Sequence, residues 1–453
     1  MHYTDFTIRA RDWQEGGFKV EVTQSPMDRM RQPESASYPA ALARPLRSLE
    51  RKRARADQLQ ALGQRLADML LPAAVRQMLT ASLAAIGPEQ GLRLRLVLDD
   101  LRVANLPWEY LYLPGVQRGD GQDGFLALDP RLSLVRHEAI PMLTGSVAAR
   151  WPLKLVVGFS APKDTPQLDL KAERTVIEEA LAGVHGVEVV WVDHLTVPRL
   201  EAACQGAHLF HFAGHGGFIW EDNKQQGAGV LYLEEPDGQP LPFPVDHLAL
   251  TLRAAGVRVV VLGGCDTGRR DGVNAWSGVA PALMRVGIPA TVAMQYALYD
   301  DAAVAFARRF YQALAAGLTL DEAMLAGRLA ILNLRQPGEL DWGVPVLYMR
   351  SADGMVFPEM AADPALEALR QEQRVTVRQR ASELHDEMTG LQVSQAPEAG
   401  VEVDQEIEQL APGGAAVGAR IERLTGGRIQ TDQKVRLIGQ GGRLLGVRIG
   451  SKE

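Results

Sequence analysis

The chain has 453 residues, 46% hydrophobic and 23% charged, with a formal net charge of −7. This composition is typical of a globular chain of roughly two to three domains, and it excludes wholesale disorder. The mildly acidic balance argues against nucleic acid as a partner, and two cysteines are too few for a disulfide framework or a four-thiolate zinc site. No apolar run reaches the roughly 18 residues needed to span a bilayer, and no secretory signal opens the chain, so we expect a cytoplasmic protein.

The first part of the chain, residues 1–141, mixes helical and strand patterns. Residues 41–67 and 74–86 carry apolar side chains at helical spacing. Residues 92–98 alternate like a half-buried strand, and residues 132–136 form a further short strand pattern. We expect this N-terminal region to brace the main sheet of the protein.

The second part, residues 142–352, alternates short apolar runs with amphipathic helices. The predicted strands are 153–159, 187–192, 208–213, 257–262 and 290–294. The predicted helices are 169–182, 197–205, 300–316 and 320–334. Strand runs without alternation, separated by helices, predict an α/β domain with a mostly parallel sheet and helices on both faces.

The third part divides by charge and by an internal repeat. Residues 353–400 lie in an acidic stretch, since residues 363–409 hold eleven acids against four arginines, and we expect a helix and a linker there. Within residues 401–453, the segment 404–421 aligns with 432–449 at a spacing of 28. Each copy is a strand, a Gly-Gly turn and a strand, which predicts a small module of two β-hairpins. A module with so few strands needs a partner surface to be stable.

Two predicted strand ends carry residues suited to nucleophilic catalysis. One strand runs into Gly214 and His215, and the next runs through two glycines into Cys265. Ligands of open α/β sheets bind at the carboxyl ends of the strands, and a cysteine just before a helix meets N–H groups that favour the thiolate. The two residues are 50 positions apart, which is the His-to-Cys separation known for caspases.

Other interpretations of these residues are weaker. A single histidine in a glycine turn is more often structural, and most free cysteines are inert packing residues, as we expect for Cys204. His211 and His215 lie four apart on a strand and hence about 13 Å apart, so we expect no metal site. Phosphate-binding glycine loops are missing from the sequence, so no nucleotide cofactor is expected, and the lack of a Gly-x-Ser-x-Gly elbow argues against a small-molecule hydrolase.

Two motifs carry a family resemblance. His211-Phe-Ala-Gly-His-Gly and Leu262-Gly-Gly-Cys-Asp-Thr-Gly resemble the histidine and cysteine motifs of CHAT-domain proteins, which are caspase-like cysteine peptidases of the caspase, separase and gingipain group. Further segments that resemble this family are 106–109, 125–128, 278–294, 301–311 and 342–348. The resemblance covers about residues 55–350.

The resemblance implies a caspase-like fold and a cysteine endopeptidase that cleaves a specific protein partner in a bacterial signalling or defence pathway. Cys265 would be the nucleophile, and His215 would keep the thiol reactive and protonate the leaving amine. The backbone N–H groups of Gly216 and Cys265 would hold the oxyanion. No cofactor is implied. The alternative is a catalytically inactive CHAT scaffold for protein–protein contact.

The substrate pocket departs from part of this family. Metacaspase-type relatives carry an acid two residues before the cysteine, and this chain has Gly263 there. Asp164 and Asp266 are the pocket candidates, although each also fits a solvated or turn-capping acid. We further expect a regulatory or recruiting protein to bind the C-terminal repeat.

Overall fold

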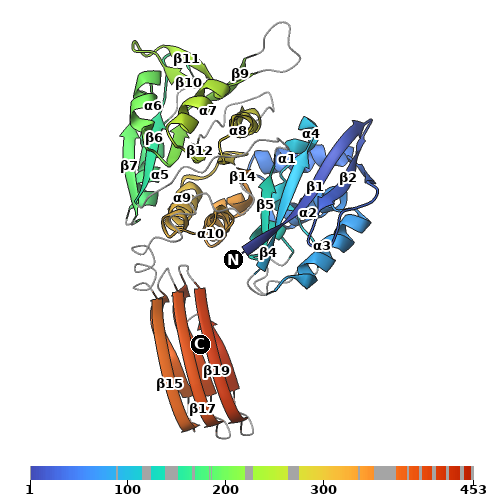
Figure 1. Ribbon diagram of the computed structural model, residues 1–453, viewed down its shortest axis with the longest axis vertical. Helices are drawn as coiled ribbons and strands as arrows, with labels where there is room; N and C mark the ends of the chain where they lie inside the picture. The colour runs from blue at the N-terminus through green and yellow to red at the C-terminus, as the bar shows by residue number, and fades with distance from the viewer. Residues whose placement is uncertain are drawn as a thin grey trace. The chain divides into compact units, whose positions relative to one another are not determined.

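The computed structural model describes residues 2–87, 90–114, 124–137, 152–165, 169–182, 184, 186–219, 228–263, 275–334 and 337–350, with the backbone of six strands between 374 and 449. These residues belong to two compact units, 1–360 and 361–453 (Figure 1). None of the helices in the described ranges is both long enough and apolar enough to cross a membrane.

A mostly parallel sheet of eleven strands runs through the first unit. Its strands are β1 (His2–Gln14), β2 (Gly17–Gln24), β3 (Glu34–Ser37), β4 (Gln90–Leu98), β5 (Leu132–Arg136), β6 (Leu153–Phe159), β7 (Val187–Val192), β8 (Leu209–Ala213), β12 (Val259–Gly263), β13 (Ala290–Met294) and β14 (Pro345–Met349). Their order is β3-β2-β1-β4-β5-β14-β13-β12-β8-β6-β7. Only the pairs β1–β2, β2–β3 and β13–β14 are antiparallel among these described strands. The predicted α/β fold with a mostly parallel sheet is confirmed.

The N-terminal region continues this sheet. Strands β1 to β5 lie beyond β14, and the junction is the pair Arg136–Tyr348. The helices of this region are α1 (Ala43–Glu50), α2 (Ala56–Leu70), α3 (Ala73–Ala85) and α4 (Leu101–Ala104). The predicted helical stretch 41–67 is broken between α1 and α2, where Lys52 has a φ of 55°. A left-handed residue cannot continue a helix, and the apolar spacing alone did not reveal this break.

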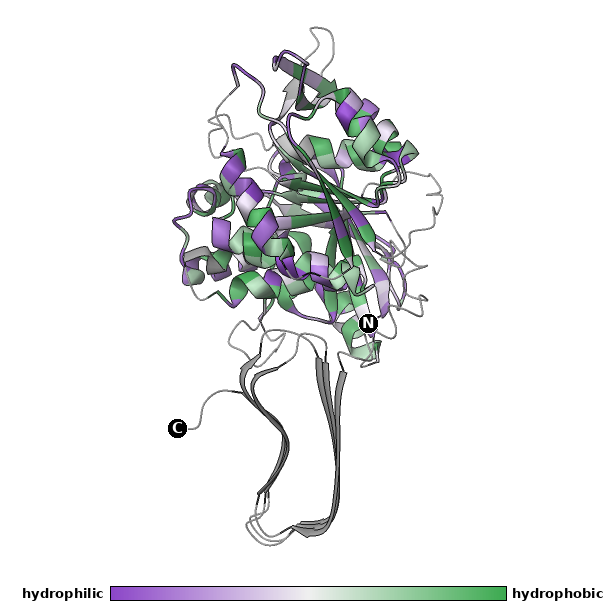
Figure 2. Cartoon of the chain, turned by 90° about the vertical axis from the view of Figure 1, so that its left-hand side faces the viewer, coloured by the Kyte–Doolittle hydropathy of each residue, from purple (hydrophilic) through white to green (hydrophobic). Residues whose placement is uncertain are grey.

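Helices cover both faces of the sheet, as predicted. One face carries α6 (Val197–Cys204), α7 (Val245–Ala254) and α8 (Ala275–Val286), and the other carries α5 (Leu170–Leu181), α9 (Asp300–Ala315) and α10 (Leu320–Leu332). Side chains alternate along a strand, so Phe210 and Phe212 pack into the core with α7 and α8 while His211 contacts α9. The strands between the helices are predominantly hydrophobic (Figure 2). A small antiparallel sheet of β9 (Gly216–Ile219), β10 (Ala228–Glu234) and β11 (Pro240–Pro244) adjoins the strand end of β8.

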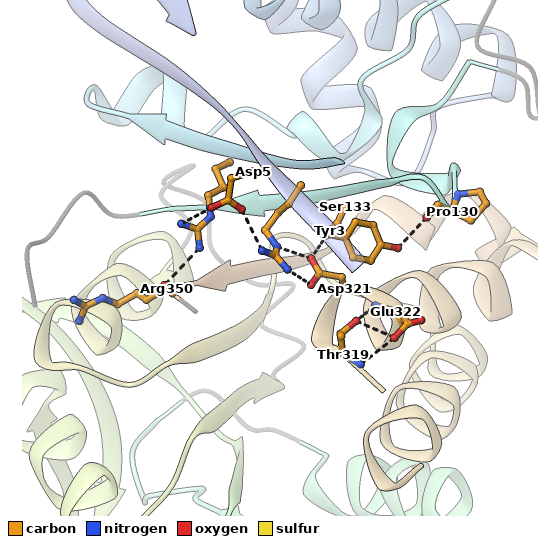
Figure 3. Close-up of polar contacts among 10 residues, drawn as sticks. Tyr3, Asp5, Pro130, Ser133, Thr319, Asp321, Glu322 and Arg350 are labelled. Carbon is orange, nitrogen blue, oxygen red and sulfur yellow. Dashed lines mark hydrogen bonds and ion pairs between the residues drawn. The ribbon is translucent and has the colours of Figure 1, made fainter. Parts of the chain in front are cut away.

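A buried ion network ties the N-terminal strands to α10 (Figure 3). Arg93 on β4 donates from Nε and Nη2 to the carboxylate of Asp321 at 2.9 and 2.6 Å, and from Nη1 to Asp5 at 3.1 Å. The Ser133 hydroxyl donates to Asp321 at 2.5 Å. The side chains of Arg93 and Asp321 are both 0% exposed. Because a buried charge without its partner is costly, the N-terminal region and the helical layer depend on each other.

The Leu-Pro-Trp-Glu segment is part of the core. Trp108 is fully buried and donates from Nε1 to the carbonyl of Val103 at 2.8 Å. Glu109 accepts two hydrogen bonds from Arg136, at 3.1 and 2.8 Å, and both side chains are buried. The segment therefore stabilises the junction between β5 and the rest of the sheet.

The described part of the second unit is a set of parallel strands. Its strands are β15 (Arg374–Leu384), β16 (Glu387–Ala396), β17 (Gly400–Leu410), β18 (Ala415–Leu424), β19 (Arg428–Ile438) and β20 (Arg443–Ile449). They form two sheets, β15-β17-β19 and β16-β18-β20, with every described pair parallel. Asp404 lies beside Asp432, and Val417 lies beside Leu445, so the repeat of 28 residues is also the pairing register.

These pairings correct two expectations. The two strands of a copy do not pair as a hairpin, because each pairs in parallel with the equivalent strand of the neighbouring copy. Residues 374–384 and 387–396 form two further strands of the repeat, where a helix and a linker were expected. Their charges alternate with apolar residues such as Val375 and Val377, a strand pattern that the count of charges concealed.

Candidate functional site

The two strands that precede the candidate catalytic residues are neighbours. β8 and β12 pair in parallel, and Ala213 lies beside Gly263 in their register. His215 follows Ala213 by two residues, and Cys265 follows Gly263 by two residues. Cys265 and Asp266 lie outside the described residues.

His215 lies between the edge of the main sheet and the small sheet β9–β11. Its carbonyl accepts a hydrogen bond from the N–H of Tyr232 on β10 at 2.9 Å, and its side chain is largely buried. Gly216, the candidate oxyanion residue, begins β9 and pairs with Leu231. At Gly214 a Cβ would lie 2.6 Å from the ring of Phe212 and 2.9 Å from the carbonyl oxygen of Ser160. Only glycine fits there, so the sharp turn that leads to His215 requires it.

Asp164 lies on an exposed turn after β6. It has a φ of 60°, and the N–H of the preceding Lys163 donates to the carbonyl of Gly238 at 2.8 Å. Within the described part of the chain, no contact joins Asp164 to His215 or Gly263.

Two residues that the sequence analysis did not select converge on Gly263. A Cβ at this glycine would lie 2.5 Å from Nε2 of His211 and 3.0 Å from Oε1 of Glu173. His211 comes from β8, and Glu173 comes from α5, whose first turn is capped by the side chain of Asp169. The space that a side chain at position 263 would need is therefore filled by an imidazole and a carboxyl group.

His211 is held as a neutral imidazole. Its Nδ1 lies 2.8 Å from the hydroxyl of Tyr311 on α9, and the residue is 6% exposed. Burial lowers the pKa of His211 to about 4 and raises the pKa of the Tyr311 phenol. No described residue forms a hydrogen bond with Nε2, the ring nitrogen that faces Gly263.

Glu173 is a carboxyl group in a poorly solvated position. The residue keeps part of its surface exposed, yet burial of the carboxyl, with a smaller effect from Asp300, raises its pKa to about 7. The sequence held one signal, because Glu173 falls on the same helical stripe as Leu170 and Ile177. An acid on an apolar stripe was overlooked because no strand-end motif surrounds it.

Two further expectations concern Cys204 and a metal site. Cys204 is fully buried, and burial raises the pKa of its thiol to about 12, which fits the packing role expected for it. Among the described residues, no group of three or more histidines, cysteines and acids could hold a metal ion.

Comparisons with known proteins give one family and several distant structural neighbours. Gingipain R, an Arg-specific cysteine proteinase, shares 13% identity over 67% of this chain and 68% of its own, with a TM-score of 0.36. A complex of the RgpB pro- and mature domains from Porphyromonas gingivalis shares 13% identity over 69% and 78%, with a TM-score of 0.39. Separase of Saccharomyces cerevisiae, in its complex with securin, shares 14% identity over 61% and 17%, with a TM-score of 0.34. No curated protein gives a match.

The family assignment comes from the sequence itself. The CHAT domain family model matches residues 60–383, which is well over half of the chain. The match includes both strand ends, the Leu-Pro-Trp-Glu segment and helices α5 to α10. The chain belongs to the CHAT domain family.

Proposed function

We propose that the protein is a cysteine endopeptidase that cleaves a specific protein partner, with Cys265 as nucleophile and His215 as its acid–base partner. The supporting observation is the register of β8 and β12. Ala213 and Gly263 lie side by side in the register of β8 and β12. His215 and Cys265 each follow this pair by two positions. A nucleophile and its base need this kind of proximity.

The chemistry proceeds in two stages. The thiolate of Cys265 attacks the scissile carbonyl carbon, and the N–H groups of Gly216 and Cys265 stabilise the negative oxygen. His215 donates a proton to the departing amine, the C–N bond breaks, and a thioester remains. Water, deprotonated by His215, then attacks the thioester and releases the acid and the free thiol.

Labelling with a thiol-directed peptide electrophile tests this function. The chain has only two cysteines, and the buried Cys204 should stay silent, so any rapid labelling reports Cys265. The label should be absent in Cys265→Ala, strongly slowed in His215→Ala, and retained in Cys204→Ala. Equal labelling of wild type and His215→Ala would show an unactivated thiol and favour the inactive scaffold.

We also propose that the second unit recruits a regulatory or substrate protein. The outer strands of its two described sheets are β15 and β19 in one and β16 and β20 in the other, and such edges pair readily with another chain. Residues 410–453 carry eight bases and three acids, a net charge of +5 that favours an acidic partner. A cytoplasmic role in bacterial signalling or defence completes this proposal, since a chain with two cysteines has no disulfide framework and suits a reducing compartment.

A further inference from the structure

We propose that Glu173 and His211 line the pocket for the residue on the amino side of the scissile bond, P1, and that this pocket selects a cationic side chain, lysine or arginine. The inference rests on the proposed function, because it assumes that Cys265 attacks the P1 carbonyl. Glu173, the specificity residue, lies on α5 and outside the histidine and cysteine motifs.

Glu173 and His211 approach the end of β12 together. Oε1 of Glu173 and Nε2 of His211 lie within 3.0 Å of one point, the place of a Cβ on Gly263. Gly263 precedes Cys265 by two residues, and two residues of chain span at most about 7 Å. The P1 side chain leaves the carbon that is bonded to the attacked carbonyl. A long side chain at P1 can therefore reach the carboxyl group of Glu173.

The two groups have the hydrogen-bonding character of a cation site. An ionised carboxylate only accepts, and the imidazole of His211 is neutral. When the Nδ1–H of His211 donates to the oxygen of Tyr311, Nε2 also presents a lone pair. In the described part of the chain, no donor forms a hydrogen bond with the Glu173 carboxyl or with Nε2. An ammonium or guanidinium group would supply the missing donors.

The charges around Glu173 also favour a cationic ligand. The one described charged group that acts on its carboxyl is Asp300, an exposed acid at the start of α9, and it adds negative potential. The adjacent Arg174 binds Asp193 at 2.8 Å and Glu178 at 2.9 Å, and its guanidinium lies over the ring of Trp191. Arg174 is thus engaged elsewhere. A neutral P1 side chain would leave the carboxylate poorly solvated, whereas a cation would offset its charge.

Peptide aldehydes that differ only at P1 test the inference on the full chain. Tripeptide aldehydes ending in argininal and in norleucinal bind a catalytic cysteine reversibly, and inhibition constants compare them. We expect the argininal compound to bind wild type at least about tenfold more tightly, and Glu173→Gln to lose that preference. Glu179→Gln, an exposed acid on the same helix, is the matched control and should keep it. Thermal unfolding of Glu173→Gln should show no loss of stability, which separates pocket chemistry from misfolding.

The outcomes are distinguishable. Equal binding of both aldehydes to wild type, with Cys265 still modified, overturns the cationic P1 pocket and leaves the peptidase intact. A preference that survives in Glu173→Gln but disappears in Asp164→Asn assigns the pocket to Asp164 and also overturns the inference. Binding of neither aldehyde, with no reaction at Cys265, overturns both the pocket and the proposed function.

Discussion

Ala213 and Gly263 lie beside each other in the parallel register of β8 and β12. The 50 residues that separate His215 from Cys265 therefore correspond to an excursion that leaves the end of one strand and returns to the end of its neighbour. That excursion contains the small sheet β9–β11 and helix α7. The separation of 50 residues between His215 and Cys265 thus reflects the adjacency of β8 and β12.

Loss of either member of the proposed dyad should abolish proteolysis without unfolding the protein. We expect Cys265→Ala and His215→Ala each to lower kcat/KM by about a thousandfold or more, and the double variant to lose little further, because the two groups act as a unit. Cleavage of a verified substrate and thermal unfolding measure the two properties separately. Wild-type cleavage by Cys265→Ala would refute the assignment of the nucleophile.

Because the pKa of Glu173 is raised, the preference for lysine or arginine at P1 should depend on pH. The carboxyl holds its proton up to about pH 7, so cleavage after lysine or arginine should improve as pH rises through 7, relative to cleavage after norleucine. Among the described residues, the titratable groups that act on or lie near the Glu173 carboxyl are Asp300 and His211. The pKa of His211 is about 4, so it stays neutral across this range. The ratio of kcat/KM for the two substrates, measured from pH 6 to 8, removes the titration of the dyad, which is common to both. A ratio that stays constant in wild type contradicts the prediction.

The raised pKa of Glu173 also predicts that the folded protein loses stability as pH rises, in contrast to the gain in cleavage after lysine or arginine. The folded state binds the Glu173 proton more tightly than the unfolded state, so the free energy of unfolding falls as pH rises from about 4.5 to about 7. Glu173→Gln removes this loss and should be more stable than wild type at pH 8, by roughly 2 kcal/mol. Denaturant unfolding at pH 5 and pH 8 checks this. An equal difference between variant and wild type at both pH values would show that the carboxyl is well solvated.

The sequence predicted the strands of residues 153–294 better than the candidate site as a whole. Buried parallel strands have apolar runs, and glycine turns mark strand ends, so β8, β12 and His215 could be located from local pattern. The helical stripe of α5 marks Glu173 as facing inward, but its proximity to Gly263 depends on α5 packing beside β8 and β12, which is a tertiary relationship. The parallel repeat was missed for a similar reason, since a strand-turn-strand copy has the same local pattern whether it pairs with itself or with its neighbour.

Asp321 should be one of the most sensitive positions outside the site. Its carboxylate is fully buried and neutralises Arg93, so Asp321→Ala leaves a buried guanidinium without its main partner and should cost about 3–5 kcal/mol. Asp57→Ala, which removes an exposed ion pair with Arg55, is the control and should change stability far less than Asp321→Ala. Chemical denaturation compares the two. Similar small losses would show that the network contributes little and that the N-terminal region is detachable.

Gly263 should tolerate no side chain. In Gly263→Ala the new Cβ would meet Nε2 of His211 at 2.5 Å and Oε1 of Glu173 at 3.0 Å, so the strand end or both side chains must shift. We expect a loss of activity of about tenfold or more with the fold retained, because the displacement lies two residues from Cys265. Gly87→Ala, where the nearest atom would be 3.8 Å away, is the matched control. Full activity in Gly263→Ala would mean that this strand end adjusts freely and that the pocket is not rigid.

Truncation distinguishes a recruiting second unit from a structural one. The strands begin at Arg374, so a cut after Gly400 would leave β15 and β16 without β17 and β18, and an exposed, unpaired copy promotes aggregation. A cut after Met360, at the boundary of the two compact units, removes the repeat as a whole. If the unit recruits a partner, the 1–360 protein should cleave short peptides at the wild-type rate and melt at the same temperature, but lose cleavage of the partner protein.

High salt should weaken partner binding in the full chain, because residues 410–453 carry a net charge of +5. Loss of peptide cleavage together with a markedly lower melting temperature in the 1–360 protein would instead make the repeat part of the catalytic fold.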